Sequence, residues 1–108
     1  MKDDSFYIDH ILNSINRILA YISGKDKDYF DRDQITQDAV VRQLEIIGEA
    51  TKRVSNEFRT KYPDIPWSDM AGMRDVLIHD YIDVDFEVVW KTASEDIPHL
   101  KVLLGKVK

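Results

Sequence analysis

Residues 6–22 read FYIDHILNSINRILAYI, and their apolar side chains recur at spacings of three and four. An α-helix has about 3.6 residues per turn, so this spacing gathers the apolar side chains into one stripe. Asp4 or Ser5 is expected to cap the start of the helix, and Ser23 with Gly24 is expected to end it. The stripe consists of Phe6, Ile8, Ile11, Leu12, Ile15, Ile18, Leu19 and Ile22.

A second long helical pattern runs through residues 33–54 and is apolar over a wider face than one stripe. Gly48 lies in its middle, where glycine costs about 1 kcal/mol relative to alanine. Together these features predict close packing on more than one side of the helix. A subunit interface and a central position in a monomeric bundle account for them equally well. The intervening residues 25–33 are dense in charge around Tyr29 and Phe30 and predict a loop or a single turn.

Two prolines separate this second helix from the rest of the chain. The residue before a proline avoids helical backbone angles, so Pro63 and Pro66 predict an extended connection. Ser68 is expected to cap a third helix that ends near Asp80. Asp83 is expected to cap a fourth helix.

The C-terminal helical pattern continues past Pro98, where a kink or a restart of the helix is expected. No stretch of the sequence alternates between apolar and polar residues as a strand would. The sequence therefore predicts an all-α fold, with one domain over residues 1–108 arranged as an antiparallel up-and-down bundle of four to five helices.

The composition restricts the chemistry that the chain can perform. It holds 108 residues and no cysteine, which excludes disulfides, cysteine-ligated metals and a thiol nucleophile. No histidine spacing typical of a metal site and no glycine-rich phosphate loop is present, so neither a metal nor a cofactor is expected. The acidic N-terminus and the lack of any run of about 20 apolar residues predict a soluble, cytoplasmic protein without a membrane segment. Of the three histidines, His10 is expected to be structural and His99 to face solvent.

The charge is distributed unevenly along the chain. Fifteen basic and twenty acidic residues give a net charge of −5, the wrong sign for indiscriminate binding to nucleic acid. Residues 51–61 differ, because four basic side chains there stand against one acidic side chain, a local charge of +3. An acidic body with one basic segment predicts a small, salt-sensitive RNA footprint. The predicted RNA-binding patch consists of Lys52, Arg53, Arg59 and Lys61.

The stretch MRDVLIHDY, residues 73–81, concentrates the side chains most suited to acid–base and phosphate chemistry. His79 is a candidate acid or base, because only histidine titrates near neutral pH without perturbation. Arg74 falls inside the apolar arc of the predicted helix and therefore needs an anionic partner. That partner is either Glu45 or Glu49, which lie four apart on one helix face, or the phosphate of a ligand.

Asp75 and His79 share the other flank of this helix with Gly72, whose missing side chain leaves room for a backbone or a ligand. Arg74 and His79 are about 140° apart on a regular helix, so one copy does not aim both side chains at one atom. Two copies related by a two-fold axis can supply both groups to one cleft. A polar helix face without a catalytic role is the simpler interpretation of the same residues.

Three blocks of the sequence carry a family resemblance. LEIIGEATKRVS at residues 44–55, YPDIPWSDMAGMRDVLIHDY at 62–81 and VDFEVVWKTASEDIPHL at 84–100 resemble the HepT-like family of the HEPN superfamily. The order and the spacing of all three blocks agree with that family. The resemblance covers most of the chain, from residue 33 to residue 100, and is more specific than one short motif.

The R-x4-H-x-Y motif of that family is present without departure as Arg74, His79 and Tyr81, with Asp75 as the polar residue after the arginine. The resemblance implies a HEPN-like bundle that forms a homodimer, with both motifs lining one cleft. It also implies a metal-independent RNA endonuclease that is the toxin of a type VII toxin–antitoxin pair. The implied partner is an MntA-like minimal nucleotidyltransferase, which silences the toxin by AMPylation, the transfer of AMP units to the motif tyrosine, here Tyr81. A higher complex with this antitoxin is compatible with the resemblance.

The residue types suit such chemistry. RNA cleavage without a metal needs a base for the 2′-hydroxyl proton, an acid for the 5′-oxygen and a cation for the phosphorane charge. His79 is predicted to supply acid–base catalysis and Arg74 to hold the scissile phosphate. Asp75, Glu45 or Glu49 is predicted to orient them. A non-catalytic adaptor that binds a nucleotide beside a nucleotidyltransferase is the alternative function, and a plain oligomerisation bundle is a third.

Overall fold

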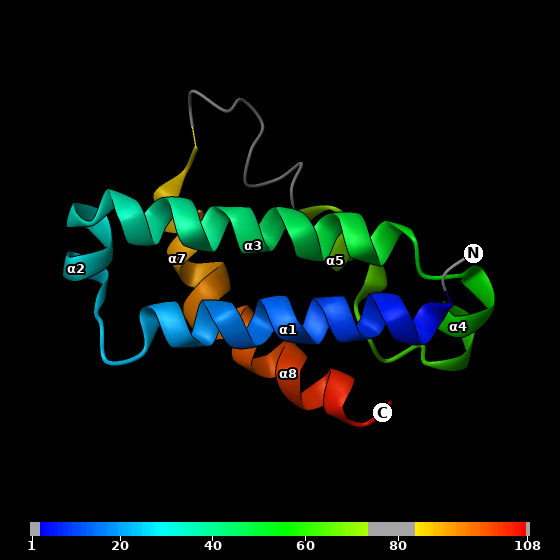
Figure 1. Cartoon of the computed structure of the whole chain (residues 1–108). Coiled ribbons are helices and arrows are strands. Elements are labelled where there is room, and N and C mark those ends of the chain that lie inside the picture. The colour runs from blue at the N-terminus through cyan, green and yellow to red at the C-terminus, as the bar shows by residue number, and fades with distance from the viewer. Residues whose placement is uncertain (1–2, 74–83, 108) are drawn as a thin grey trace.

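The computed structural model describes residues 3–73 and 84–107, and every regular element within these ranges is helical (Figure 1). The predicted all-α class is therefore confirmed. None of the helices described is long and apolar enough to cross a membrane. The elements are α1 (Asp4–Ile22), α2 (Lys27–Arg32), α3 (Gln34–Lys52), α4 (Asn56–Lys61), α5 (Trp67–Ala71), α7 (Phe86–Lys91), the π-helical turn η1 (Thr92–Asp96) and α8 (Ile97–Gly105).

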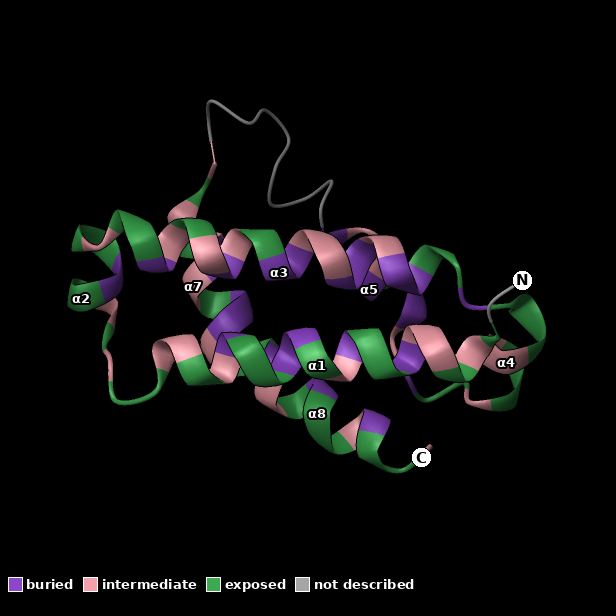
Figure 2. Ribbon diagram, in the orientation of Figure 1, coloured by how far each residue is buried: buried purple, intermediate pink, exposed green. Residues whose placement is uncertain are grey.

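The antiparallel pair of α1 and α3 forms the centre of the fold (Figure 1). The apolar stripe predicted for α1 is confirmed, because Ile11, Ile15 and Ile18 are fully buried. Leu44 and Ile47 of α3 are buried to the same extent. In Figure 2, buried residues recur along both helices between exposed ones. Each such side chain stabilises the fold by about 1.5–3 kcal/mol when it leaves water, so this seam is the main hydrophobic core.

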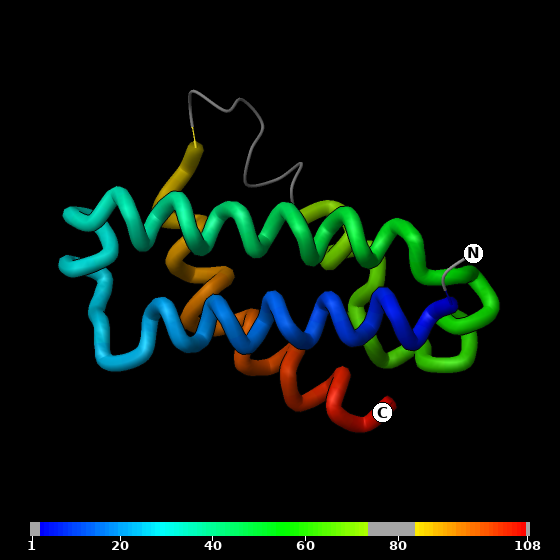
Figure 3. Tube along the Cα trace, in the orientation of Figure 1, coloured from blue at the N-terminus to red at the C-terminus, as the bar shows by residue number. Residues whose placement is uncertain are grey.

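The remaining helices cover the sides of this pair. Helix α5 packs on α3, and the C-terminal run from α7 through η1 to α8 crosses from α3 to α1 (Figure 3). Pro98 lies in the first turn of α8, a position where proline is common in helices. The turn η1 immediately before it departs from regular α-helical bonding, so the predicted kink or restart near Pro98 is confirmed.

The connection between the two long helices forms helix α2, so the expected loop or single turn is wrong. The carboxylate of Asp26 caps this helix by accepting a hydrogen bond from the backbone N–H of Tyr29 at 2.9 Å. Phe30 is fully buried, and its ring lies 5.2 Å from the ring of Trp90 and 6.2 Å from that of Phe86. A cap and one buried ring thus stabilise a helix in a charge-dense segment.

The start of α1 is capped by Asp3, and not by Asp4 or Ser5 as expected. The carboxylate of Asp3 accepts a hydrogen bond from the backbone N–H of Phe6 at 3.0 Å. Asp4 is engaged elsewhere, since its carboxylate accepts hydrogen bonds from the backbone N–H and the hydroxyl of Ser55 at 2.8 and 2.7 Å. These two bonds tie the start of α1 to the start of α4.

Helix α5 begins at Trp67, one residue before the cap expected at Ser68. Trp67 is buried at this first helical position. The expected end of this helix near Asp80 and the expected cap Asp83 lie outside the described residues. The cap observed at the start of α7 is Asp85, whose carboxylate accepts backbone hydrogen bonds from the first turn of that helix.

The end of α1 and the start of α3 agree with the predicted signals. Helix α1 ends at Ile22, and Gly24 follows with φ of 71°, the left-handed conformation that favours glycine. Helix α3 follows Asp33 as its N-cap residue, and Gly48 is buried within it. Burial of Gly48 confirms the close packing expected around the middle of this helix.

We expect Phe30→Ala to lower the free energy of unfolding by about 3–5 kcal/mol, because it removes a fully buried ring and leaves a cavity. Tyr29→Ala is the matched control in the same helix. Tyr29 is 41% exposed, so its loss is expected to change stability by less than about 1 kcal/mol. Urea denaturation followed by circular dichroism measures both variants. Equal losses would contradict the role assigned to the buried ring.

Candidate functional site

The motif residues of the sequence analysis lie outside the described residues. Arg74, Asp75, His79 and Tyr81 all fall within residues 74–83. The structure describes the chain on both sides of this segment and the α3 carboxylates expected to support it. The candidate site is therefore described by the residues that flank the motif segment and by these α3 carboxylates.

The chain enters the motif segment from α5, which packs on α3. Met70 is fully buried and Met73 is 8% exposed, so both side chains anchor the chain just before Arg74. Gly72 is the C-cap residue of α5. A Cβ at this position would lie 3.4 Å from the carbonyl oxygen of Ser68, an ordinary van der Waals distance. The described surroundings therefore do not require glycine at position 72.

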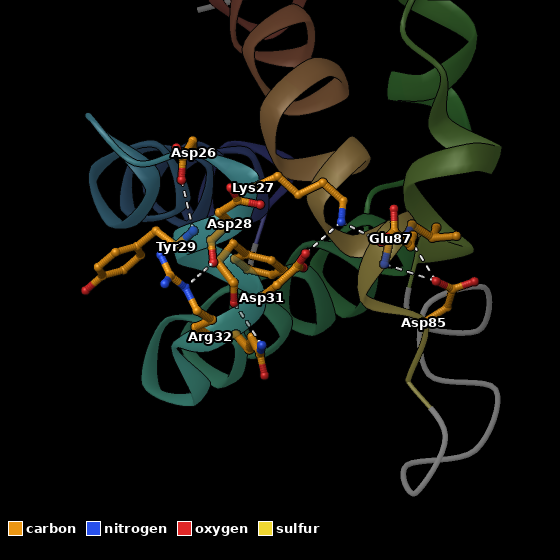
Figure 4. Close-up of polar contacts among 11 residues, drawn as sticks. Asp26, Lys27, Asp28, Tyr29, Asp31, Arg32, Asp85 and Glu87 are labelled. Carbon is orange, nitrogen blue, oxygen red and sulfur yellow. Dashed lines mark hydrogen bonds and ion pairs between the residues drawn. The ribbon is translucent and has the colours of Figure 1, made fainter.

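The chain leaves the motif segment at α7, which an exposed ion bridge joins to α2 (Figure 4). The Nζ atom of Lys27 lies 2.7 Å from the carboxylate of Asp31 and 2.5 Å from that of Glu87. The hydrogen bonds to Asp31 and then to Glu87 raise the pKa of Lys27 above its ordinary value. Asp85, two residues before Glu87, caps α7 by accepting hydrogen bonds from the backbone N–H groups of Glu87 and Val88.

A groove with a volume of about 550 Å³ lies between α1 and α3. Glu45 and Glu49, the carboxylates proposed as partners of Arg74, lie half-buried on its α3 side, one turn apart. They share one face of α3, as the sequence analysis expected. Arg42, Ile46 and Arg53 also line the α3 side, and Phe6, Tyr7 and His10 form the α1 side.

The α1 wall of this groove is aromatic. The ring centroid of Phe6 lies 4.6 Å from that of His10 and 5.2 Å from that of Tyr7, to which it is nearly perpendicular. His10 is exposed at the surface and its ring packs on that of Phe6, and the structural role expected of it stays a prediction. The groove thus has aromatic side chains on its α1 side and both acidic and basic side chains on its α3 side.

The basic side chains of the predicted RNA-binding patch have different neighbours. The Nζ atom of Lys52 lies 3.9 Å from the carboxylate of Glu49. Arg53 lines the groove between α1 and α3. The Nζ atom of Lys61 lies over the ring of Tyr62, 5.6 Å from its centroid. Lys52, Arg53 and Lys61 are exposed, so their charges remain accessible to a polyanion.

The fourth basic residue, Arg59, joins two helices. It lies on α4, a short helix that the sequence analysis did not anticipate and that the hydroxyl of Ser55 caps by accepting from the N–H of Phe58 at 3.1 Å. Its Nη2 atom donates to the carbonyl oxygen of Thr51 at 2.6 Å, in the last turn of α3. The same carbonyl oxygen also accepts from the backbone N–H of Val54 at 3.1 Å, and the C-terminal end of a helix favours a cation. Arg59 therefore caps the C-terminal end of α3.

A second cavity, with a volume of about 380 Å³, lies between α5 and α8. Asp64, Asp69 and Asp96 line it together with His99, which is exposed, as expected. Three carboxylates in one cavity oppose binding of a phosphate backbone. Within residues 3–73 and 84–107, no group of three His, Cys, Asp or Glu side chains is arranged to hold a metal ion.

We expect Arg59→Met to lower the free energy of unfolding by about 0.5–1.5 kcal/mol, because the carbonyl of Thr51 loses one of its two donors and keeps the backbone N–H of Val54. Lys61→Met on the same helix is the matched control, and its exposed side chain should change stability by no more than about 0.5 kcal/mol. Urea denaturation measures both variants. If Arg59→Met were as stable as Lys61→Met, Arg59 would not be a structural residue.

Comparison with protein families gives one match over nearly the whole chain. The family described as "Ribonuclease HepT-like" matches residues 11–107. This range begins within α1, ends beyond α8 and includes the segment that holds the motif residues. No solved structure shows a significant match.

Several curated proteins are similar over more than nine-tenths of the chain. "Probable ribonuclease HepT" of Thermococcus cleftensis is 46% identical over 102 residues, which cover 94% of this chain and 93% of that protein. A "Putative RNase" of Caldanaerobacter subterraneus is 41% identical over 101 residues, which cover 94% and 90%. A "Gamma-glutamylcyclotransferase and putative RNase" of Methanocaldococcus jannaschii is 46% identical over 106 residues, 98% of this chain. The chain spans 48% of the length of this last protein.

Proposed function

The chain belongs to the HepT-like ribonuclease family, and on this premise we propose that it is the toxin of a type VII toxin–antitoxin pair and cleaves RNA without a metal ion. One observation carries the proposal: the residues matched by the family contain the complete R-x4-H-x-Y motif. Arg74, His79 and Tyr81 form this motif. RNA is the substrate, and the cytoplasm is the proposed place of action.

The proposed reaction is a transesterification at one phosphodiester bond. The 2′-oxygen of the RNA attacks the adjacent phosphorus while its proton passes to a neutral His79. The bond between phosphorus and the 5′-oxygen breaks, and a protonated His79 gives its proton to that departing oxygen. The products are a 2′,3′-cyclic phosphate and a 5′-hydroxyl. The reaction needs no oxidant, reductant or metal-bound water.

Arg74 is proposed to hold the scissile phosphate. A guanidinium binds phosphate oxygens through parallel hydrogen bonds and stabilises the charge that grows on them in the transition state. Asp75 orients Arg74 or His79 from the same segment. Glu45 and Glu49, half-buried and one turn apart on α3, offer a carboxylate to Arg74 before RNA binds.

A homodimer is part of the proposal. Arg74 and His79 are about 140° apart on a regular helix, so a single copy does not direct both toward one phosphate. A two-fold axis brings two arginines and two histidines to one cleft. One His79 then acts as the base and the other as the acid at each cut.

The proposed antitoxin is an MntA-like minimal nucleotidyltransferase. It transfers AMP from ATP to the hydroxyl of Tyr81: a bond forms between the tyrosine oxygen and the α-phosphorus, and pyrophosphate leaves. Tyr81 is close to Arg74 in the sequence, so the phosphate added to its hydroxyl is proposed to occupy the place of the substrate phosphate beside Arg74. AMPylation therefore blocks RNA binding.

The RNA footprint is proposed to be small and sensitive to salt. Lys52, Arg53 and Lys61 are exposed basic side chains on a chain with a net charge of −5. Arg59, which the sequence placed in the same patch, donates to the end of α3 and contributes less to RNA binding than its charge suggests.

The purified chain is expected to cut a defined RNA in the presence of EDTA, because side chains alone supply the chemistry. His79→Ala is expected to lower the cleavage rate by about 100-fold or more, the usual contribution of general acid–base catalysis. Gel electrophoresis of end-labelled RNA measures the rate. His99→Ala is the control, since His99 is exposed and outside the motif. Loss of cleavage on chelation, or full activity in His79→Ala, would contradict the mechanism.

A nucleotide-binding adaptor is the second candidate function, and the groove between α1 and α3 favours it. Its volume of about 550 Å³ lies within the range of small-ligand sites, and it combines an aromatic wall with Arg42 and Arg53. Growth on expression of the chain alone separates the two functions. A ribonuclease toxin arrests growth and Arg74→Ala relieves the arrest, whereas an adaptor is harmless.

We expect the wild-type chain, incubated with the partner enzyme and ATP, to gain the mass of AMP and to lose RNA cleavage. Tyr81→Phe lacks the acceptor hydroxyl, so it should stay unmodified and active under the same conditions. Intact-mass spectrometry beside the cleavage assay measures both. Tyr29→Phe removes an exposed hydroxyl outside the motif and is expected to be modified like the wild type. Neutralisation of Tyr81→Phe to the wild-type extent would overturn this mechanism of silencing.

A further inference from the structure

Flat aromatic side chains line the α1 side of the groove between α1 and α3. The ring centroids of Phe6 and His10 lie 4.6 Å apart, and Tyr7 meets Phe6 edge-on. Nucleic-acid bases stack on such rings, and any base can do so because each has a flat π face. The groove has a volume of about 550 Å³, which is enough to hold one base. This side of the groove therefore suits an unpaired base.

Glu45 supplies a carboxylate on the opposite side of the groove. It is half-buried, and no ion pair among residues 3–73 and 84–107 includes it. Glu49, one turn further along α3, approaches Lys52 instead, at 3.9 Å. A half-buried carboxylate needs hydrogen-bond donors, because it has lost part of its water. Arg74 is proposed to hold the scissile phosphate once RNA binds, so Glu45 then takes its donors from a ligand in the groove.

Two arginines stand at the ends of the α3 side. Arg42 and Arg53 are exposed, and no ion pair among the described residues includes either of them. Eleven residues separate them, about 16 Å along the helix axis. They can therefore contact two different phosphates of one strand while a base of that strand lies between them. Arg53 also belongs to the predicted RNA-binding patch, so the groove and the patch form one continuous surface.

A carboxylate in this place discriminates among the four bases. An ionised carboxylate only accepts hydrogen bonds, and its two oxygens suit two parallel donors. Guanine alone presents two such donors side by side on its Watson–Crick edge, the N–H groups at N1 and N2. Adenine and cytosine place a ring-nitrogen acceptor beside their amino group, and uracil flanks its one N–H with two carbonyl oxygens. Each of these three bases would point a lone pair at the carboxylate.

From these features we infer that the groove is a subsite for one unpaired guanine of the RNA. The base stacks on the aromatic side, and the N–H groups at N1 and N2 donate to Glu45. Hydrogen bonds between Asp4 and Ser55 hold the aromatic start of α1 beside the C-terminal half of α3, which carries Glu45. A guanine within a duplex is excluded, because its Watson–Crick edge is already paired and its face is stacked.

This inference rests on the proposed ribonuclease function and specifies part of its substrate. Single-stranded RNA that contains guanine is the substrate class, and Glu45 is a specificity-determining residue. The same carboxylate makes the groove a poor site for adenine nucleotides such as ATP, because N1 of adenine is an acceptor. The groove therefore favours a base of RNA over the ligand of an ATP-binding adaptor.

Binding to uncleavable RNA tests the subsite without relying on catalysis. The probes are a short 2′-O-methyl oligouridine and two versions of it in which one uridine is replaced by guanosine or adenosine. Their methylated 2′-oxygens cannot attack the phosphorus, so isothermal titration calorimetry of the full chain measures affinity alone. The version with guanine should bind about 10-fold or more tightly than the other two, the usual effect of one bidentate base contact.

Glu45→Gln is expected to change which base is preferred. The amide offers one donor and one acceptor, which match N1 and N6 of adenine, so the version with adenine should become the tightest of the three. Glu57→Gln makes the same change at an exposed position on α4 outside the groove. This control should keep the preference for guanine. Circular dichroism confirms that both variants keep their helices.

The outcomes separate this inference from the proposed function. Equal affinity of the wild type for the three RNAs would overturn the subsite, as would a preference for guanine that survives in Glu45→Gln. A uniform change in affinity for all three RNAs in Glu45→Gln would assign Glu45 to charge balance alone and overturn it as well. A preference that moves from guanine to adenine supports the subsite even where the chain cleaves no RNA, a result that would contradict only the proposed ribonuclease chemistry.

Discussion

The burial of the isoleucine stripe of α1 against α3 is the interaction on which the rest of the structure depends. Ile11, Ile15 and Ile18 exclude water completely at this seam. Helices α8 and η1 pack on α1, and helix α5 packs on α3, so both long helices are covered on more than one side. The face of α3 that remains outside carries charges of both signs. The hydrophobic seam thereby determines which face of α3 is exposed among the described residues.

Polar side chains join neighbouring elements at the ends of the bundle. Asp4 joins the starts of α1 and α4, Arg59 closes the end of α3, and Lys27 joins α2 to α7. Before the motif the chain is anchored by buried methionines, and after it by the capped start of α7. Catalysis by Arg74 and His79 would need such anchors, because arginine and histidine side chains act on one phosphate only when their backbones are held in position.

The parts of the fold that depend on periodicity could be predicted from the sequence, and the parts that depend on distant partners could not. The spacing of apolar residues predicted both long helices, and the glycine after α1 and the proline in α8 behave as expected. Asp4 was wrongly expected to cap α1 because its partner, Ser55, lies at the start of another helix. The hydrogen bond from Arg59 to Thr51 could not be predicted either, because the two residues belong to different helices. Helix α2 was missed because the burial of Phe30 arises from α7, far along the chain. In the site, the spacing of Glu45 and Glu49 predicted that they share one face of α3. The composition of residues 51–61 did not predict that each of the four basic side chains there contacts a different neighbour.

The chemistry of the new RNA ends decides whether side chains of this HepT-like ribonuclease cleave RNA without a metal ion. Fragments of a defined RNA, cut by the purified chain, can be analysed by mass spectrometry and by their reaction with a polynucleotide kinase. Catalysis by His79 and Arg74 predicts a 2′,3′-cyclic phosphate on one fragment and a 5′-hydroxyl on the other. A 3′-hydroxyl with a 5′-phosphate, the ends left when water attacks the phosphorus, would contradict it.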